Sequence, residues 1–278
     1  MYMAPKAKES YDKLVKGVSE VVNSKGWIEF LKVQSKFYNY SFNNAFLIAI
    51  QCPYASRVTG FNTWKKLGRN VKKGSKGIKI LAPLRKKVKA QDAKGKETDK
   101  FVLYGFRSVN VFDISQTEGK ELPEICKPLE GDPEEAKKLF DALKEIIEIP
   151  IAEEEIAGKA NGYYDLLDDR IALEVKNSLL HKAKTLAHEY THSMLDRKDI
   201  EVKQSRDEAE IAAESVAFIV SDHFGLDTSS YSFEYVAAWS GADPEKILKQ
   251  GVIIQTTASK IINQVEEKLK KETDQVVA

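Results

Sequence analysis

Apolar residues recur every three or four positions along the first fifty residues of the chain. The segments YDKLVKGVSEVV (11–22) and WIEFLKVQSKF (27–37) show this spacing, which is typical of amphipathic helices. Ser41 can cap a third helix, FNNAFLIAI, and Pro53 stops it. The pattern therefore predicts that the chain begins with three helices.

Strand-like patterns replace the helical ones after residue 60. The apolar run GIKILAPL (77–84) and the longer FVLYGFRSVNVFDI (101–114) lie on either side of the turn-rich stretch DAKGKE. This arrangement predicts a β-hairpin or a small sheet. Alternation would place Phe101 and Leu103 on one face of the second strand and Tyr104 and Phe106 on the other, so that one pair could be exposed.

The second half of the chain is expected to be mainly helical, with a small sheet. Helical patterns cover the segments 133–148, 178–194, 207–224 and 243–269. Between the first two, NGYYDLLDDRIALEV predicts two short strands around a polar turn. The fold class is therefore α+β.

A polar segment with two prolines separates the two halves. We expect a first domain at 1–115, a linker at 116–132 and a second domain at 133–278, whose first helix has Asp132 as N-cap. A length of 278 residues accommodates two such domains.

The helix expected at 178–194 contains the motif His188-Glu189-Tyr190-Thr191-His192. Histidines at positions i and i+4 project from one helix face, so both imidazoles can bind one Zn²⁺. Glu189 then lies beside the open coordination position and can act as the general base for peptide hydrolysis. The alternative is a pair of partly buried polar residues on an amphipathic helix.

A zinc site of this type needs a third ligand, and the next helix offers carboxylates. Glu210 and Glu214 lie one turn apart in an otherwise apolar run, where a metal ion would supply the counter-charge. We assign Glu210 as the third ligand and Glu214 as the acceptor for an imidazole N–H, with the reverse order left open. Two glutamates on a solvated helix edge would explain the same pattern, and His181 and His223 are weaker candidates for the third ligand.

The segment Arg170–Val175 is expected to form an edge strand just before the metal-binding helix. Such a strand can pair with an extended substrate main chain, although ordinary sheet completion explains the pattern equally well. The hydroxyl of Tyr190, Tyr231 or Tyr235 could stabilise an oxyanion, and the sequence selects none of them.

Charge is distributed unevenly, although the net formal charge is only +1. Residues 57–100 contain fifteen Lys or Arg and three Asp or Glu, so the later part of the chain is strongly acidic. Aromatic residues are interleaved with the basic run. Positive grooves lined by aromatic rings bind single-stranded nucleic acid, so we predict single-stranded DNA binding, with RNA, an acidic protein partner or a plain solvated surface as alternatives.

The residues expected to contact DNA share a basic, aromatic or amide side chain. They are Tyr40, Asn43, Asn44, Arg57, Trp64, Lys65, Lys66, Arg69, Lys72, Lys73, Lys76 and Lys79.

The localisation expected from the sequence is cytoplasmic. The chain has only two cysteines, Cys52 and Cys126, which suits a reducing compartment. We find no secretory signal and no apolar stretch long enough to span a membrane, so no membrane partner is expected.

Two long strings resemble a known family. Residues 40–45 (YSFNNA) together with 57–83 (RVTGFNTWKKLGRNVKKGSKGIKILAP, with Asn70 in the middle) are similar to the N-terminal single-stranded-DNA-binding domain of ArdC-type antirestriction proteins. HEYTH and EIAAESVAF resemble the zincin-like metallopeptidase domain of ArdC relatives and of the ImmA/IrrE group. In gluzincins the third ligand is often followed four residues later by Asp, and here that position is Glu214.

The resemblance implies a mobile-element protein that binds single-stranded DNA and carries a gluzincin-like zinc site. We therefore expect a DNA-associated zinc metallopeptidase that hydrolyses a protein substrate bound to DNA. The main alternative is a non-proteolytic protein that shields DNA, with a structural or vestigial zinc site. A nuclease is less well supported because we find no second metal site in the sequence.

Overall fold

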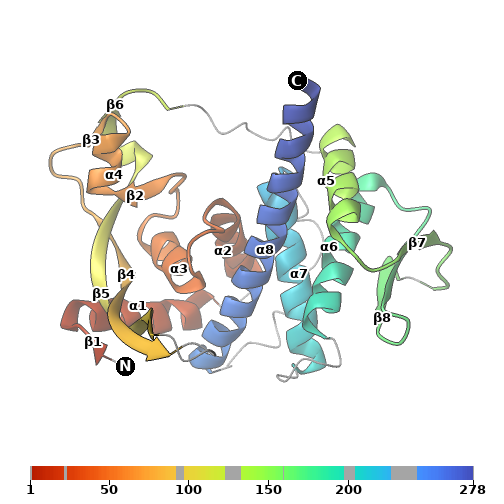
Figure 1. Cartoon of the computed structure of the whole chain (residues 1–278), viewed down its shortest axis with the longest axis horizontal. Helices are drawn as coiled ribbons and strands as arrows, with labels where there is room; N and C mark the ends of the chain where they lie inside the picture. Colours follow the sequence, from red (N-terminus) through yellow and green to blue (C-terminus); the bar gives the residue numbers. More distant parts are fainter. Residues whose placement is uncertain are drawn as a thin grey trace. The chain divides into compact units, whose positions relative to one another are not determined.

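A computed structural model describes residues 2–21, 24–91, 97–122, 133–158, 160–196, 204–226 and 243–277 (Figure 1). Contacts divide the chain into two compact units. The first contains residues 1–20 and 43–122, and the second contains residues 21–42 and 123–278. Both combine helices with small sheets, which confirms the predicted α+β class.

The first unit is built around one long strand. Its helices are α1 (Pro5–Val21), α3 (Phe42–Gln51) and α4 (Phe61–Lys66). α1 and α3 each extend by one residue beyond the unit, and α4 lies within it. β5 (Glu97–Asp113) pairs with β1 (Tyr2–Met3), β2 (Val58–Gly60) and β4 (Ile78–Gln91). A separate pair joins β3 (Arg69–Val71) to β6 (Thr117–Gly119), just after the 3-10 turn Ile114–Gln116.

The predicted hairpin is present as the antiparallel pair β4 and β5. Val111 lies opposite Ile78 and both are buried, so the base of the hairpin contributes to the core of the unit. Residues 117–119, which we had assigned to the linker, form β6 and pair with β3. The rest of the expected linker up to Asp132, including Cys126, lies outside the described residues.

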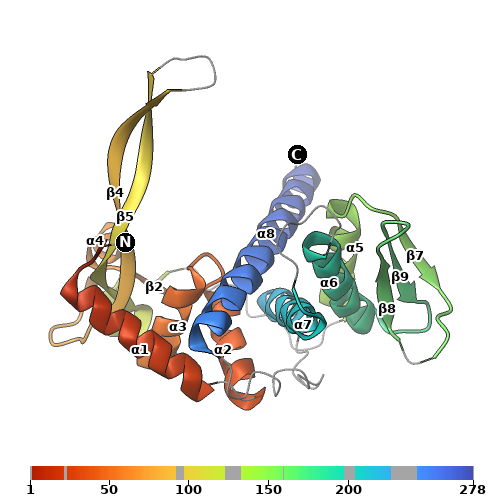
Figure 2. The ribbon, with the colours of Figure 1, turned by 90° about the horizontal axis from the view of Figure 1, so that it is seen from below.

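The second unit packs helices on one another and on a small sheet. Its helices are α2 (Ser24–Lys36), α5 (Pro133–Ile146), α6 (Leu179–Leu195), α7 (Arg206–His223) and α8 (Pro244–Val277). α6 contacts both α5 and α7, and α8 contacts both α5 and α7 (Figure 2). The sheet has the order β7 (Ile151–Glu154), β9 (Arg170–Glu174), β8 (Gly162–Asp165), and β8 and β9 both contact α6.

Helix ends follow the signals in the sequence. Ser178 caps α6 by accepting a hydrogen bond from the backbone N–H of His181. Gly225 ends α7 with φ +82°, and the N–H of Leu226 reaches back to the carbonyl of Ser221 at 2.8 Å. This left-handed glycine closure is how many helices terminate.

α2 packs in the second unit, although it precedes most of the first unit in sequence. The indole N–H of Trp27 donates to the hydroxyl of Ser215 on α7 at 3.0 Å, and Trp27 is buried beside Phe30 and Phe42. The expected first domain, residues 1–115, therefore contains a helix that the structure groups with the C-terminal helices.

No helix in the described ranges is long and apolar enough to cross a bilayer.

Gly251, in the middle of α8, lies against the buried ring of Phe42. A Cβ at this position would lie 2.3 Å from the Cε2 and Cζ atoms of Phe42. We predict that Gly251→Ala lowers the melting temperature, because overpacking costs about 1–3 kcal/mol and exceeds the gain of about 0.5–1 kcal/mol from replacing a helical glycine. Thermal unfolding followed by circular dichroism measures this, with the exposed Val252→Ala as the control. An increase in melting temperature would contradict the close approach.

Candidate metal centre

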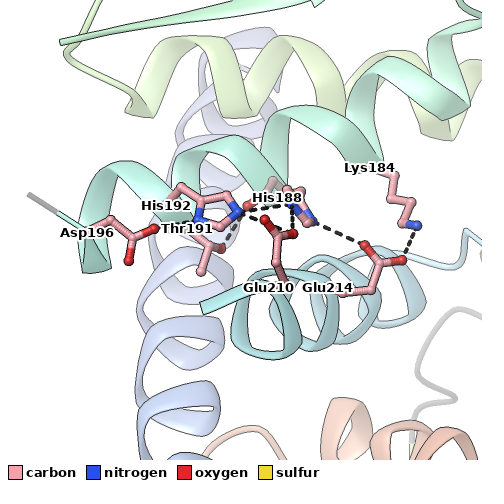
Figure 3. Close-up of polar contacts among 8 residues, drawn as sticks. Lys184, His188, Thr191, His192, Asp196, Glu210 and Glu214 are labelled. Carbon is pink, nitrogen blue, oxygen red and sulfur yellow. Dashed lines mark hydrogen bonds and ion pairs between the residues drawn. The ribbon is translucent and has the colours of Figure 1, made fainter. Parts of the chain in front are cut away.

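α6 brings the two histidines of the HEYTH motif side by side. Their ring centroids are 4.8 Å apart and their Nε2 atoms are 3.1 Å apart (Figure 3). The opposite side of the helix is buried through small or apolar residues such as Ala183, Leu186 and Ala187. This packing holds the backbone so that spacing alone directs both imidazoles to one point.

α7 supplies the carboxylate that faces these nitrogens. The Oε2 atom of Glu210 lies 3.6 Å from Nε2 of His188 and 3.9 Å from Nε2 of His192. Ligands of a tetrahedral zinc ion at 2.0–2.1 Å lie about 3.3 Å from one another, so the three atoms have the separations of ligands that share an ion. His188, His192 and Glu210 each offer one ligand atom, and these three atoms lie within 4.8 Å of one another.

Carboxylates on the far side of each ring fix the imidazole tautomers. Nδ1 of His188 lies 3.1 Å from Oε2 of Glu214, and Nδ1 of His192 lies 2.5 Å from Oδ2 of Asp196. An ionised carboxylate only accepts hydrogen bonds, so each Nδ1 carries the proton. Both Nε2 atoms then present lone pairs to each other and to Glu210. Such an arrangement requires a proton or a metal ion between them.

The pKa of His188 reflects this demand for positive charge. Burial lowers the pKa, but the hydrogen bonds to Glu210 and Glu214 outweigh that effect and raise it to about 9. A proton can therefore balance the carboxylates when no metal is bound, and a divalent ion could replace it. The chemistry of the donor set, two imidazoles and one carboxylate, fits zinc and other divalent metals.

A buried lysine neutralises the outer carboxylate. The Nζ atom of Lys184 pairs with Oε1 of Glu214, and Lys184 and His188 lie one turn apart on α6. The pKa of Glu214 is lowered despite burial, because His188 and Lys184 both stabilise its charged form. Glu214 is therefore a charged acceptor that holds the ring of His188.

Glu189 is buried on the same helix but is not part of the three-atom cluster. Burial raises its pKa, and the nearby His188 and His192 oppose that rise. Its carboxylate also accepts a hydrogen bond from the backbone N–H of Tyr164 on β8. The group therefore lies between the histidines and the sheet.

Glu208, the third carboxylate of α7, has a different role. Its side chain accepts a hydrogen bond from the backbone N–H of Ser205, and Ser205 in turn caps the N–H of Glu208. A hydrogen bond from Lys246 and those from Ser205 lower the pKa of Glu208 to about 2. This capping box fixes the start of α7 and hence the positions of Glu210 and Glu214.

The strand next to the site differs from the prediction. β9 lies between β7 and β8, so the expectation that residues 170–175 form an edge strand is wrong. β8 is an edge of this sheet among the described strands, and it lies close to α6 at Gly162, where a Cβ would come within 2.6 Å of Thr185. The absence of a side chain at Gly162 lets the strand approach α6.

The remaining candidates of the sequence lie elsewhere. His223 is bonded to the carbonyl of Ser35 and to Glu266, away from the cluster, and His181 is not part of it. The side chain of Tyr190 is partly buried, and Tyr231 and Tyr235 lie outside the described residues. Sequence reasoning did not identify Asp196 or Lys184, although each lies four residues from a histidine, where helical partners are found.

Three of the residues expected to contact DNA have structural roles. Trp64 is 1% exposed and donates to the carbonyl of Phe112, so its ring cannot stack on a base. The guanidinium of Arg69 donates to the side chain and carbonyl of Thr117 and to the carbonyl of Lys120. The amide of Asn44 pairs with both backbone groups of Leu81.

The other expected DNA contacts are more accessible. Five lysines are exposed, Lys65, Lys66, Lys72, Lys73 and Lys76, and Arg57, Lys79 and Asn43 are partly exposed. Tyr40 is partly buried and belongs to the second unit. The lysines from 65 to 76 are therefore the part of the prediction that leaves charge available to a ligand.

Comparison with known proteins agrees with this architecture. Residues 7–112 match the N-terminal domain of the anti-restriction factor ArdC. An uncharacterized protein of Bacillus anthracis is 28% identical over 305 residues, which span 94% of this chain and 51% of that protein. The chain thus spans about half the length of this curated relative.

Two crystal structures of the antirestriction ArdC protein from the R388 plasmid share the fold. The metal-free structure has a TM-score of 0.54 at 22% identity and covers 82% of this chain and 84% of its own. The Mn(II)-bound structure has a TM-score of 0.55 at 20% identity, covering 94% and 96%. Residues 7–112 therefore form a domain of the ArdC N-terminal type, and the chain shares the fold of the ArdC structures over most of its length.

Proposed function

We propose that this protein is an ArdC-type, DNA-associated zinc metallopeptidase, with His188, His192 and Glu210 as metal ligands. The convergence of two Nε2 atoms and one carboxylate oxygen on a single point is the observation that carries this proposal. Two imidazoles and a carboxylate are the ligand set of several zinc peptidases. The Mn(II)-bound form of the R388 protein supports a divalent metal in this fold.

The protein groups around the proposed metal site would have separate roles in hydrolysis. The metal would supply a Lewis acid that polarises the scissile carbonyl and a bound water. Glu214 and Asp196 keep the Nδ1 protons in place, so that both Nε2 lone pairs point to the ion. Glu189, whose pKa is raised by burial, accepts the proton of the attacking water as general base.

The presence of Glu189 favours hydrolysis over a purely structural site. A structural metal needs ligands but no additional buried carboxylate beside them. Burying such a group costs free energy, and here the two histidines and the backbone N–H of Tyr164 stabilise its charged form. A role of Glu189 as general base would explain why a carboxylate is buried at this position.

The first unit would bring the peptidase to single-stranded DNA. Exposed lysines at 65, 66, 72, 73 and 76 form a basic surface on α4 and the loop that follows β3. The hydrogen bond from Nζ of Lys72 to the carbonyl of Ser115 orders one of them without neutralising it. We infer that the substrate is a protein bound to the same DNA.

We predict that Glu189→Gln retains one metal ion per chain but abolishes proteolysis. The substitution removes the base and leaves the ligands unchanged, so the rate should fall by a factor of about 10² to 10⁴. The measurement combines metal analysis with digestion of a heparin-purified mixture of DNA-binding proteins, with and without a single-stranded oligonucleotide.

Two outcomes of this experiment oppose the proposal. Equal cleavage by wild type and Glu189→Gln would remove Glu189 as the base. No cleavage by metal-loaded wild type, with or without DNA, would favour the non-proteolytic shield.

We also predict that replacing Lys72, Lys73 and Lys76 by Ala weakens binding to single-stranded DNA. Each lost phosphate contact lowers the salt dependence of log K by about 0.7, so the slope should decrease by up to about 2. Fluorescence anisotropy of a labelled oligothymidylate at several salt concentrations measures both quantities.

The control removes equal charge from the second unit, through Lys137, Lys138 and Lys144 on α5. If the two triple variants bind single-stranded DNA equally well, the basic surface of α4 and the loop that follows β3 is not the DNA contact.

A further inference from the structure

The outer half of the β4–β5 hairpin is a two-stranded ribbon. β1 pairs with β5 only at Gly105 and Phe106, and β2 only at residues 111–113. Beyond these positions, residues 85–91 of β4 and 97–104 of β5 pair only with each other among the described strands. Figure 2 shows this ribbon extending away from the helices of its own unit.

Four consecutive apolar or aromatic side chains of this ribbon are exposed. The exposed fractions are 65% for Phe101, 38% for Val102, 42% for Leu103 and 41% for Tyr104. Single exposed apolar residues are normal, but a continuous run of them on an extended strand is unfavourable in water unless a partner covers it. The sequence predicts that one of the pairs Phe101/Leu103 and Tyr104/Phe106 is exposed. In the structure Phe101, Leu103 and Tyr104 are exposed and Phe106 is partly exposed.

A β-bulge lies where the ribbon leaves the sheet. Leu84 lies opposite Gly105 and Arg85 lies opposite Leu103, so Tyr104 is an extra residue without a direct partner on β4. Bulges of this kind increase the twist of a strand pair. The twist of the ribbon is therefore increased at the point where it leaves the sheet.

Cations lie directly opposite the exposed apolar residues. Lys87 faces Phe101 and Arg85 faces Leu103 on one side of the ribbon, and Lys86 faces Val102 on the other. Residues paired in this way share a face, with Cβ atoms about 5 Å apart. Phe101, Val102 and Leu103 thus each have a cation as their cross-strand neighbour.

Some of these cations are available to a ligand. Lys87 and Lys89 form ion pairs with Asp99 and Glu97, at 2.6 and 2.7 Å. The side chains of Arg85, Lys86 and Lys100 have no hydrogen-bond or ion-pair partner within the described ranges. They therefore keep their charge for another molecule.

The charge of the ribbon selects the class of partner. Residues 85–104 contain seven Lys or Arg and three Asp or Glu. This net positive charge disfavours pairing with the ribbon of a second copy and favours a polyanion. A polyanion that also offers flat apolar groups is a single-stranded nucleic acid, because a duplex keeps its bases stacked inside.

We propose that the β4–β5 ribbon is a second contact for single-stranded DNA, separate from the lysines of α4 and of the loop that follows β3. Phe101 provides a ring on which a base stacks, and Arg85, Lys86 and Lys100 contact the flanking phosphates. This proposal rests on the proposed DNA-binding function of the first unit and adds a stacking element to it.

Two variants test the ribbon: Phe101→Ala, and the triple variant Arg85→Gln, Lys86→Gln and Lys100→Gln. Binding of labelled 30-mer oligothymidylate, oligouridylate and a 30-base-pair duplex is measured by anisotropy at several salt concentrations. Stacking of one base is worth about 1–3 kcal/mol, so Phe101→Ala should weaken oligothymidylate binding about 5- to 100-fold with an unchanged salt slope. The triple variant should lower the slope by up to about 2.

Lys89→Gln is the matched control, because its cation is already paired with Glu97. It should bind almost as well as wild type. Since Phe101 is exposed, its replacement should leave the melting temperature unchanged, which circular dichroism checks for each variant.

Four results would overturn the ribbon proposal. If wild type binds no single-stranded oligonucleotide, the proposed DNA-binding function fails together with it. If the ribbon variants bind as wild type while the Lys72, Lys73 and Lys76 variant does not, DNA binding stands and the ribbon is excluded. If Phe101→Ala changes only the oligomeric state in light scattering, the exposed run is a contact between copies of the chain. Stronger loss on oligouridylate than on oligothymidylate would identify RNA as the ligand and also contradict the proposal.

Discussion

Two imidazole nitrogens held 3.1 Å apart are the constraint on which the second unit depends. The lone pairs of His188 and His192 point at each other and at Glu210, and this arrangement is unfavourable unless a cation lies between them. The carboxylates of Glu214 and Asp196 keep the two rings in this orientation, because each accepts a hydrogen bond from an Nδ1 proton on the far side of its ring. The local chemistry therefore specifies a positive charge at this point.

Keeping this geometry requires two helices to pack closely and in a fixed register. Both helices bury small residues, with Ala187 on α6 and Ala213 and Ala217 on α7 fully buried. The capping box of Ser205 and Glu208 fixes where α7 begins, and Trp27 of α2 holds the same helix through Ser215. Contacts outside the site thus set the distance from Glu210 to the histidines.

The sequence predicted the parts of this site that depend on local spacing. His188, Glu189 and His192 lie on one helix, so a motif of five residues is enough to bring them together. The sequence limited the candidates for the third metal ligand to Glu210 and Glu214. Which of the two faces Nε2 of His188 and which faces Nδ1 depends on how α6 and α7 cross. The central place of β9 and the membership of α2 in the second unit also depend on long-range packing, which no local pattern contains.

The basic half shows a similar limit. Interleaved aromatic and basic residues favour nucleic-acid binding, yet the pattern does not distinguish buried rings from exposed ones. Trp64 is in the core, whereas Phe101 is 65% exposed on the ribbon. The side chains of Arg69 and Asn44 likewise form hydrogen bonds with the backbone of neighbouring strands. Only the paired register of β4 and β5 shows which cations lie beside the exposed rings.

X-ray absorption spectroscopy of the protein loaded with one equivalent of zinc tests the central claim most directly. The proposed centre predicts two imidazole nitrogens and oxygen donors at about 2.0–2.1 Å, with one imidazole lost in His192→Ala. A spectrum without imidazole scattering, or one that is unchanged in His192→Ala, would contradict it.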